Sequence, residues 1–136
     1  MRTIIACLAM AACAATPTAT PAERLAGCWL APPPAAALMR WAPDSARPGV
    51  MLGVRNDPRG GEPTRFRLAL GERGVELCEL VSDGADPQCW AVAEGEGGSL
   101  EGGRAFIDRH GDRLTIEILG GGPSRLVFQG HQRRCG

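Results

Sequence analysis

The sequence predicts an all-β fold in which an antiparallel meander closes into a small barrel of about 8–10 strands. Three observations support this prediction. Short apolar runs alternate with turn residues at regular intervals, the 19 Gly and 11 Pro are spread between those runs, and no long run has the apolar spacing of a helix. A chain of 136 residues has room for one such domain with one core.

Residues 1–12 have the layout of a bacterial export signal. Arg2 supplies a positive start, and an apolar run of small residues follows over 4–12. This run is too short to span a bilayer, which needs about 20 residues. We therefore expect export, to the periplasm or to the outer membrane.

Two cleavage patterns compete after this signal. Residues 12–14 offer small side chains to ordinary signal peptidase, whereas residues 10–12 (MAA) before Cys13 are typical of a lipoprotein, with Cys13 as the lipidated residue. The segment 13–22 is rich in Ala, Thr and Pro and is expected to act as an extended spacer. The β-barrel domain then covers 23–136, and a lipid anchor is its only expected contact with a membrane.

The domain contains nine apolar runs that we expect to be strands. In chain order they cover residues 25–31, 36–41, 50–55, 64–70, 74–81, 88–93, 104–108, 113–119 and 124–131. The segment 32–34 (PPP) is expected to form a stiff corner between the first two strands.

The apolar residues of 64–70 and 74–81 predict how these two strands pair in a hairpin. With Leu70 opposite Val75, apolar side chains line one face of both strands, as the two-residue period of a strand requires. The same register pairs Leu68 with Leu77 and Phe66 with Glu79.

The two later hairpins predict the same apolar face. A two-residue turn at 110–111 pairs Ile107 with Leu114, Ala105 with Ile116, and Asp108 with Arg113 on the outer face. A turn at 121–123 pairs Ile118 with Leu126 and Ile116 with Phe128. The expected core comprises Trp29, Phe66, Leu68, Leu70, Val75, Leu77, Trp90, Val92, Ile107, Leu114, Ile116, Ile118, Leu126 and Phe128.

Four cysteines belong to the domain, and four allow three connectivities. A turn at 83–84 (DG) places Cys78 directly opposite Cys89 on the outer face. Cys28 and Cys135 lie near the two ends of the domain, and the first and last strands of a closed meander are neighbours. We therefore expect the disulfides Cys78–Cys89 and Cys28–Cys135. The alternative is a metal site or a reactive thiol, for which no C-x-x-C or Cys/His spacing is present.

Four short motifs follow one another along the chain: LAGCW at 25–29, WAP at 41–43, GVMLGV at 49–54 and FRL at 66–68. In this order and spacing they resemble a family of exported bacterial proteins known as domain of unknown function 6265, over most of residues 25–119. The resemblance implies a calycin-type, lipocalin-like barrel. It implies no particular activity.

The pair Gly27 and Trp29 also resembles the G-x-W of the first lipocalin strand. This resemblance implies that Trp29 closes one barrel end beneath an arginine near the last strand, here Arg133 or Arg134, through stacking and cation–π attraction. The chain departs from the family at two places. Residues 38–40 (LMR) replace the usual acidic residues before the motif Trp, and the Gly-rich segment 95–103 lacks the family's His and Phe.

Composition and motifs argue against most chemical functions. The 15 basic and 15 acidic residues give a net charge of zero without a basic cluster, so nucleic-acid binding is not expected. No Ser, Cys or metal-based catalytic pattern and no nucleotide fingerprint is present, so we expect a non-catalytic protein without cofactor or metal. His110 is expected in a solvated turn and His131 on the outer face.

Five residues are candidates for contact with a small apolar or amphipathic ligand. Glu79 falls on the inward face of its strand, where a carboxylate must be hydrogen-bonded or lie near the wet rim. Trp41, Met51, Phe66 and Trp90 are suited to lining an apolar cavity and equally to ordinary core packing. The alternative function is a filled barrel with an envelope-structural or protein-binding role.

Overall fold

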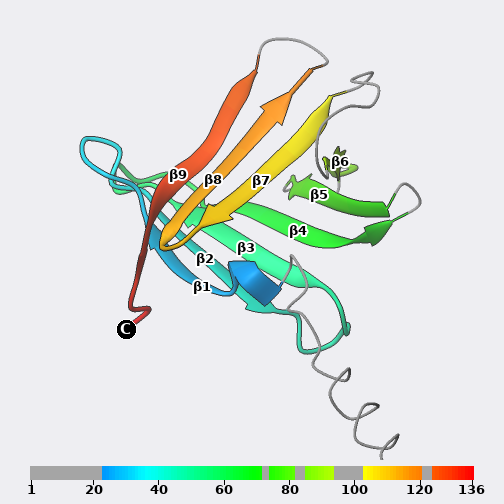
Figure 1. The fold of residues 1–136 in the computed structure, drawn as a ribbon, viewed down its shortest axis with the longest axis horizontal. Helices are drawn as coiled ribbons and strands as arrows, with labels where there is room; N and C mark the ends of the chain where they lie inside the picture. The colour runs from blue at the N-terminus through cyan, green and yellow to red at the C-terminus, as the bar shows by residue number, and fades with distance from the viewer. Residues whose placement is uncertain (1–22, 72–73, 82–84, 94–102, 121–123) are drawn as a thin grey trace, which may run out of the picture.

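The computed structural model describes residues 23–71, 74–81, 85–93, 103–120 and 124–136. They form a closed barrel of nine strands whose spatial order follows the sequence, which confirms the predicted fold class (Figure 1). The elements are η2 (Glu23–Leu25), β1 (Gly27–Leu30), β2 (Leu38–Pro43), β3 (Met51–Asn56), β4 (Thr64–Gly71), β5 (Gly74–Leu80), β6 (Gln88–Val92), β7 (Arg104–His110), β8 (Arg113–Leu119) and β9 (Arg125–Arg133). Among the described residues, no helix has the length and apolar character needed to cross a membrane.

One pair of neighbouring strands is parallel, which departs from the predicted antiparallel order. Strand β6 runs parallel to β7 over two residue pairs, Ala91 with Arg104 and Val92 with Ala105, and the other neighbours described are antiparallel. The physical reason is parity. Directions that alternate around a ring cannot close when the number of strands is odd, so a ring of nine needs a parallel pair.

The β4–β5 register is confirmed, with Leu70 opposite Val75 and Phe66 opposite Glu79. The β7–β8 register is displaced by two residues from the prediction, so that Ile107 pairs with Ile116 and Ala105 with Ile118. His110 pairs with Arg113, so the turn consists of residues 111–112 instead of 110–111. Gly111 has a φ of 62°, which favours glycine in this turn. A shift of two residues keeps every side chain on its predicted face.

A β-bulge changes the face of Leu126. Ile116 pairs with Phe128 as predicted, but the register then shifts, so Leu126 pairs with Glu117 on the outer face. Leu126 is 56% exposed, and the neighbouring Val127 is buried in its place. Leu70 is also exposed, because it lies next to the end of β4 where the hairpin extends past the core. Both residues were wrongly assigned to the core.

The interior of the barrel is filled mainly by large apolar side chains. Trp41 and Phe66 are both about 1% exposed, and their ring centroids lie 6.3 Å apart. A Cβ atom at Gly53 would lie 2.8 Å from the Trp41 ring, so only glycine fits opposite this side chain. The buried apolar cluster comprises Leu25, Trp29, Ala31, Met39, Trp41, Met51, Phe66, Leu68, Leu77, Trp90, Ala105, Leu114, Ile116, Ile118, Val127 and Phe128.

Both predicted disulfides are present. Cys28 and Cys135 are bonded with Cα atoms 5.2 Å apart, and Cys78 and Cys89 with Cα atoms 4.0 Å apart. Cys78 lies directly opposite Cys89 in the β5–β6 pairing, as expected, although the turn proposed at 83–84 lies outside the described residues. Two disulfides indicate an oxidising compartment outside the cytoplasm. The export signal, the spacer and Cys13 also lie outside the described residues.

Candidate ligand-binding site

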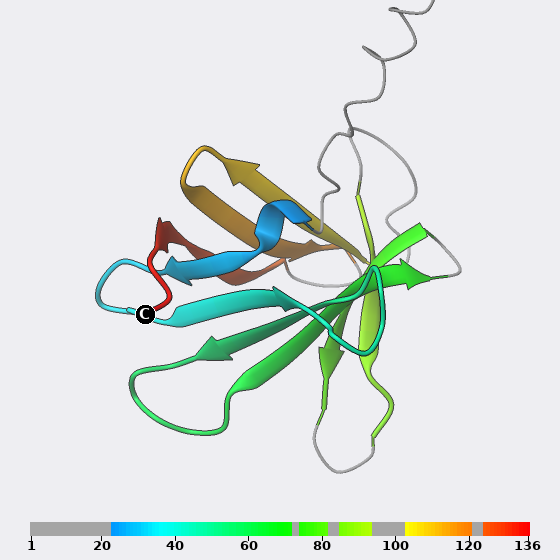
Figure 2. The same cartoon turned by 90° about the horizontal axis from the view of Figure 1, so that it is seen from below.

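The barrel has two ends, which differ in how they are covered. The η2 end contains the starts of β1, β3, β5 and β8 and the ends of β2, β4, β6, β7 and β9. The opposite end contains the end of β3, the start of β4, the end of β5 and the start of β9. Figure 2 shows η2 between β1 and the β7–β8 hairpin, so the short helix lies over part of the first end.

Trp29 holds η2 in place. Its side chain is fully buried, and its indole Nε1 donates a hydrogen bond to the Leu25 carbonyl at 3.0 Å. Gly27, with a φ of 126°, provides the bend between η2 and β1. This bend turns the chain so that Leu25 points into the barrel, where it is 1% exposed. Trp29 therefore lies buried beneath η2 at this end of the barrel.

Arg109 of β7 covers the Trp29 ring, with its guanidinium carbon 5.0 Å from the ring centroid. It also donates hydrogen bonds to the carbonyls of Arg24 and Gly111 and lies 3.4 Å from the Gln132 side-chain oxygen. The guanidinium is thus held in one orientation by a ring and several acceptors. Sequence reasoning missed this role, although the two-residue period already places Arg109 on the same face as Ile107.

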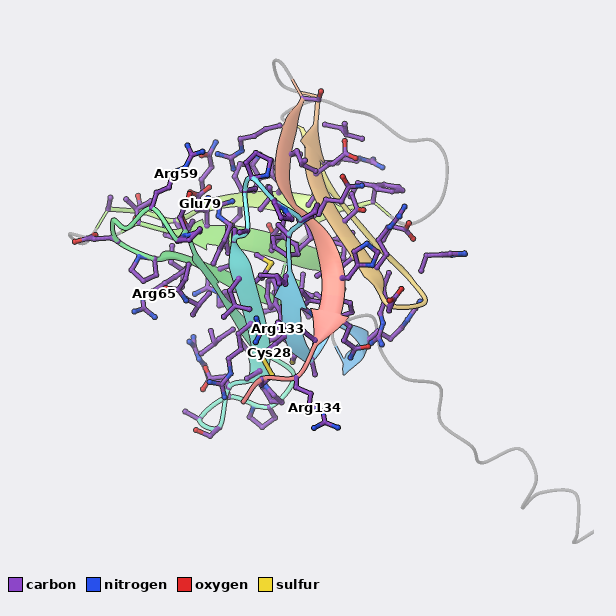
Figure 3. All side chains as sticks on the ribbon, turned by 90° about the vertical axis from the view of Figure 1, so that its left-hand side faces the viewer. Cys28, Arg59, Arg65, Glu79, Arg133 and Arg134 are labelled. Atoms are coloured by element: carbon purple, nitrogen blue, oxygen red, sulfur yellow. A yellow bond between two sulfur atoms is a disulfide. The ribbon has the colours of Figure 1, made fainter. Side chains whose placement is uncertain are left out.

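The expected caps, Arg133 and Arg134, do not cover Trp29. Arg133 lies directly opposite Cys28 in the β1–β9 pairing, so it shares the outer face of Cys28 and not the inner face of Trp29. Its Nε donates to the Arg134 carbonyl, and both arginines are exposed. Figure 3 shows both residues beside Cys28.

A cavity of about 150 Å³ lies beside η2, and we call it the η2 cavity. Its lining is mainly apolar and comes from η2 and from strands β4 to β7. Arg24 is exposed and Arg109 is half-buried, so these two residues supply the polar part of its rim. The lining residues are Arg24, Leu25, Leu68, Val75, Val92, Ala93, Ile107 and Arg109.

The two rim arginines are linked to each other through backbone atoms. Arg24 Nη2 donates to the Arg109 carbonyl at 3.2 Å, and Arg109 Nη1 donates to the Arg24 carbonyl. Within the part of the chain that the structure describes, neither guanidinium forms an ion pair with a carboxylate. The rim of the η2 cavity therefore carries two positive charges without a described counter-charge.

The opposite end is covered by arginines that have protein partners. Arg55 lies on the inner face of β3 and reaches across the barrel, where its Nη1 donates to the Val127 carbonyl at 2.6 Å and its Nη2 to Thr64 Oγ1 at 3.2 Å. Arg125 forms an ion pair with Glu79 at 2.9 Å, which joins β9 to β5 across the rim. The same guanidinium lies 5.5 Å from the centroid of a Trp90 ring.

The five predicted ligand-contacting residues lie away from the η2 cavity. Trp41, Met51 and Phe66 belong to the packed core. Trp90 is buried beneath Arg125, and Glu79 is inward-facing near the rim, where Arg125 is its ion-pair partner. Trp41 Nε1 is buried without a hydrogen-bond partner, so this indole contributes as an apolar filler.

The cavity was not predicted because it depends on where neighbouring strands end. Its apolar lining includes Leu68, Val75, Val92 and Ile107, which were all expected core residues. Strand β6 stops at Val92, and beyond this point the wall between β5 and β7 is incomplete among the described residues. The hydrophobic pattern of the sequence does not contain that information.

Among the described residues, no group of His, Cys, Asp and Glu side chains is arranged to hold a metal ion. Comparisons with protein-family models, with curated proteins and with solved structures found no match.

Proposed function

We propose that this protein is an exported, non-catalytic barrel that binds one small, largely apolar molecule in the η2 cavity. The observation that carries the proposal is the cavity itself, which has an apolar lining and a volume of about 150 Å³. Apolar cavities of roughly this volume stay dry and bind benzene-sized molecules. Within the described residues, large buried side chains such as Trp41 and Phe66 occupy the barrel core, which leaves little space there for a long-chain lipid.

The size of the cavity sets the expected affinity. A ring of about six heavy atoms binds with at most roughly 9 kcal/mol, because the best very small ligands reach about 1.5 kcal/mol per atom. Dissociation constants in the millimolar to micromolar range are therefore expected for such a ligand. This range calls for titration at high ligand concentration.

Titration with fluorobenzene, followed by ¹⁹F NMR, tests the proposal. We expect saturable binding to the wild-type protein and loss of binding in Val75→Phe, in which the added ring occupies the cavity. Leu126→Phe is the matched control, since Leu126 is exposed at the opposite end and should leave binding unchanged. Absence of saturable binding to a folded wild-type protein would reject the function.

We also propose that the protein is a periplasmic lipoprotein anchored through Cys13. The support is the export-signal layout of residues 1–12, the small residues before Cys13, the spacer at 13–22, and the two disulfides. Cys13→Ser should move the protein from the membrane fraction to the soluble periplasm. A wild-type protein that is already soluble, with its N-terminus at Ala15, would contradict the anchor.

The resemblance to the domain of unknown function 6265 family is likewise a proposal. Its support is that several residues of the quoted motifs pack against one another in the barrel. Trp41 lies against Gly53, and Phe66 lies within ring-contact distance of Trp41. A set of motif residues that shares one packing role is typical of a family-specific core.

A protein-binding barrel is the second candidate, favoured by one observation. Phe106 and Leu126 flank Glu117 in one row across β7, β8 and β9 on the outer face, and they are 40% and 56% exposed. Exposed apolar rows of this kind occur at protein interfaces. A photo-crosslinking residue at position 106 should capture a partner in the intact envelope if this candidate is correct, and should capture none if it is wrong.

A further inference from the structure

We propose that the ligand of the η2 cavity is an anion, namely a small aryl carboxylate whose ring fills the cavity and whose carboxylate binds Arg24 and Arg109. This inference rests on the proposed function, because it assigns the chemical class of the molecule that occupies the same cavity.

The charge at the rim of the η2 cavity favours an anionic ligand. Arg24 and Arg109 both line the same small cavity, and no described carboxylate neutralises either of them. Two like charges held close together repel each other, and a bound anion removes that repulsion. The carbonyl bonds between the two residues satisfy individual N–H groups but add no negative charge.

The orientation of the two guanidinium groups also favours a bound carboxylate. Each guanidinium has five N–H donors in a planar fork. Stacking on Trp29 and bonds to several acceptors hold the Arg109 fork in place, so little entropy is lost when it binds a ligand. Arg24 is exposed and uses one described bond to a carbonyl, which leaves donors for an incoming carboxylate.

A comparison with the opposite end supports this assignment. There the arginines already have acceptors within the protein, because Arg125 pairs with Glu79 and Arg55 bonds to Val127 and Thr64. Glu79 neutralises Arg125. Arg55 has uncharged acceptors and lines an apolar groove, but it is the single charged residue in that lining, whereas two arginines share the lining of the η2 cavity.

The size of the η2 cavity favours a ligand with a single ring. A volume of about 150 Å³ accommodates one ring and leaves no room for a long chain. A planar carboxylate matches the fork of a guanidinium through two parallel hydrogen bonds, which favours it over a neutral polar group. Benzoate combines these features and is therefore the probe, with the isosteric neutral benzamide as its matched comparison.

Both probes are titrated against the exported wild-type protein by ligand-observed NMR at low salt. We expect benzoate to bind about 10-fold more tightly than benzamide, since hydrogen bonds between charged groups are stronger than those to a neutral amide and solvent at the exposed rim screens part of that gain. The benzoate affinity should fall as the salt concentration rises, whereas the benzamide affinity should not.

Arginine variants identify which guanidinium group causes the preference for benzoate. Arg24→Gln should abolish most of the preference for benzoate over benzamide. Arg24 is exposed, so its replacement should not unfold the protein. Arg59→Gln is the control, because this exposed arginine lies in the turn after β3 at the opposite end and away from Cys28 in Figure 3.

The outcomes separate this inference from the function on which it rests. Equal affinities for benzoate and benzamide, or a benzoate preference that Arg24→Gln leaves intact, would overturn the anion assignment while fluorobenzene binding still supports the cavity. If fluorobenzene, benzamide and benzoate all fail to bind, the proposed function fails together with the inference.

Discussion

At the end of the barrel opposite η2, Arg55 and Arg125 reach across the opening to acceptors on other strands, whereas at the η2 end Arg24 and Arg109 stand beside a cavity. The same residue type therefore has two roles. At the opposite end, the charge is used within the protein to cover the interior. At the η2 end, a buried indole and a covering guanidinium hold a short helix in place, and the charge remains accessible to a ligand.

The difference shows that the type of a residue does not decide its role, whereas its partners do. An arginine with a carboxylate or with cross-barrel acceptors contributes to stability, and its removal should be measured as unfolding free energy. Where an arginine lies beside an apolar cavity and has no described counter-charge, its replacement should change the ligand affinity. Substitutions at both ends of the barrel test this division.

Removal of the Cys28–Cys135 disulfide should cause the largest loss of stability. This bond ties β1 at the η2 end to the C-terminal residues, with a sequence separation of 107. The double change to Ser should lower the free energy of unfolding by about 5 kcal/mol in the chain-entropy treatment. The Cys78–Cys89 pair has a separation of 11, and its removal should cost about 3 kcal/mol. Urea unfolding measures both, and equal losses would contradict the loop-length argument.

Trp29→Ala should be the most damaging single side-chain change at the η2 end. The substitution removes a fully buried indole, its bond to the Leu25 carbonyl and the surface on which Arg109 stacks. We expect a loss of about 4 kcal/mol in urea unfolding. Trp29→Phe keeps a ring and loses the N–H, so it should cost much less. A Trp29→Ala protein with a wild-type midpoint would show that this residue does not close the barrel.

Arg55→Met should destabilise the opposite end by about 2 kcal/mol, because a charged donor to two part-buried acceptors is lost. The methionine retains much of the apolar stem, which limits the effect of lost packing. Arg24→Met is the comparison at the η2 end and should change the unfolding free energy far less. If Arg24→Met were the more destabilising of the two, the division of roles between the ends would be reversed.

A double-mutant cycle distinguishes the observed cap of Trp29 from the expected one. Trp29→Leu and Arg109→Met should show a coupling energy of about 1 kcal/mol, since each removes what the other contacts. The same cycle with Arg134→Met should show additive effects. Coupling to Arg134 in place of Arg109 would restore the cap that the sequence predicted.

Glu79→Gln should have the smallest effect. The Arg125–Glu79 ion pair is partly exposed, with side-chain exposures of 52% and 26%, and such pairs contribute about 0.5 kcal/mol or less. The loss should shrink further at high salt, because exposed charges are screened. A loss of several kcal/mol that does not depend on salt would mean that the pair acts as a buried one.

The later hairpins illustrate where sequence reasoning stops. The face of each side chain in β7 and β8 was predicted correctly although the register was displaced by two residues, because alternation has a period of two. The bulge after Ile116 reversed the face on which the preceding residues of β9 lie. Leu126 is therefore exposed, and Val127 is buried. A bulge depends on how the whole sheet curves, and an apolar pattern alone does not reveal it.

The strand series, the β4–β5 register, the closed barrel and both disulfides follow from the sequence alone. These features depend on local alternation, on turns and on which strands are first and last. Tertiary structure decided the parallel β6–β7 pair, the arginine that covers Trp29 and the cavity beside η2. Each of these depends on ring closure or on side chains far apart in the sequence, such as Arg24 and Arg109, and local chemistry does not specify which distant groups will meet.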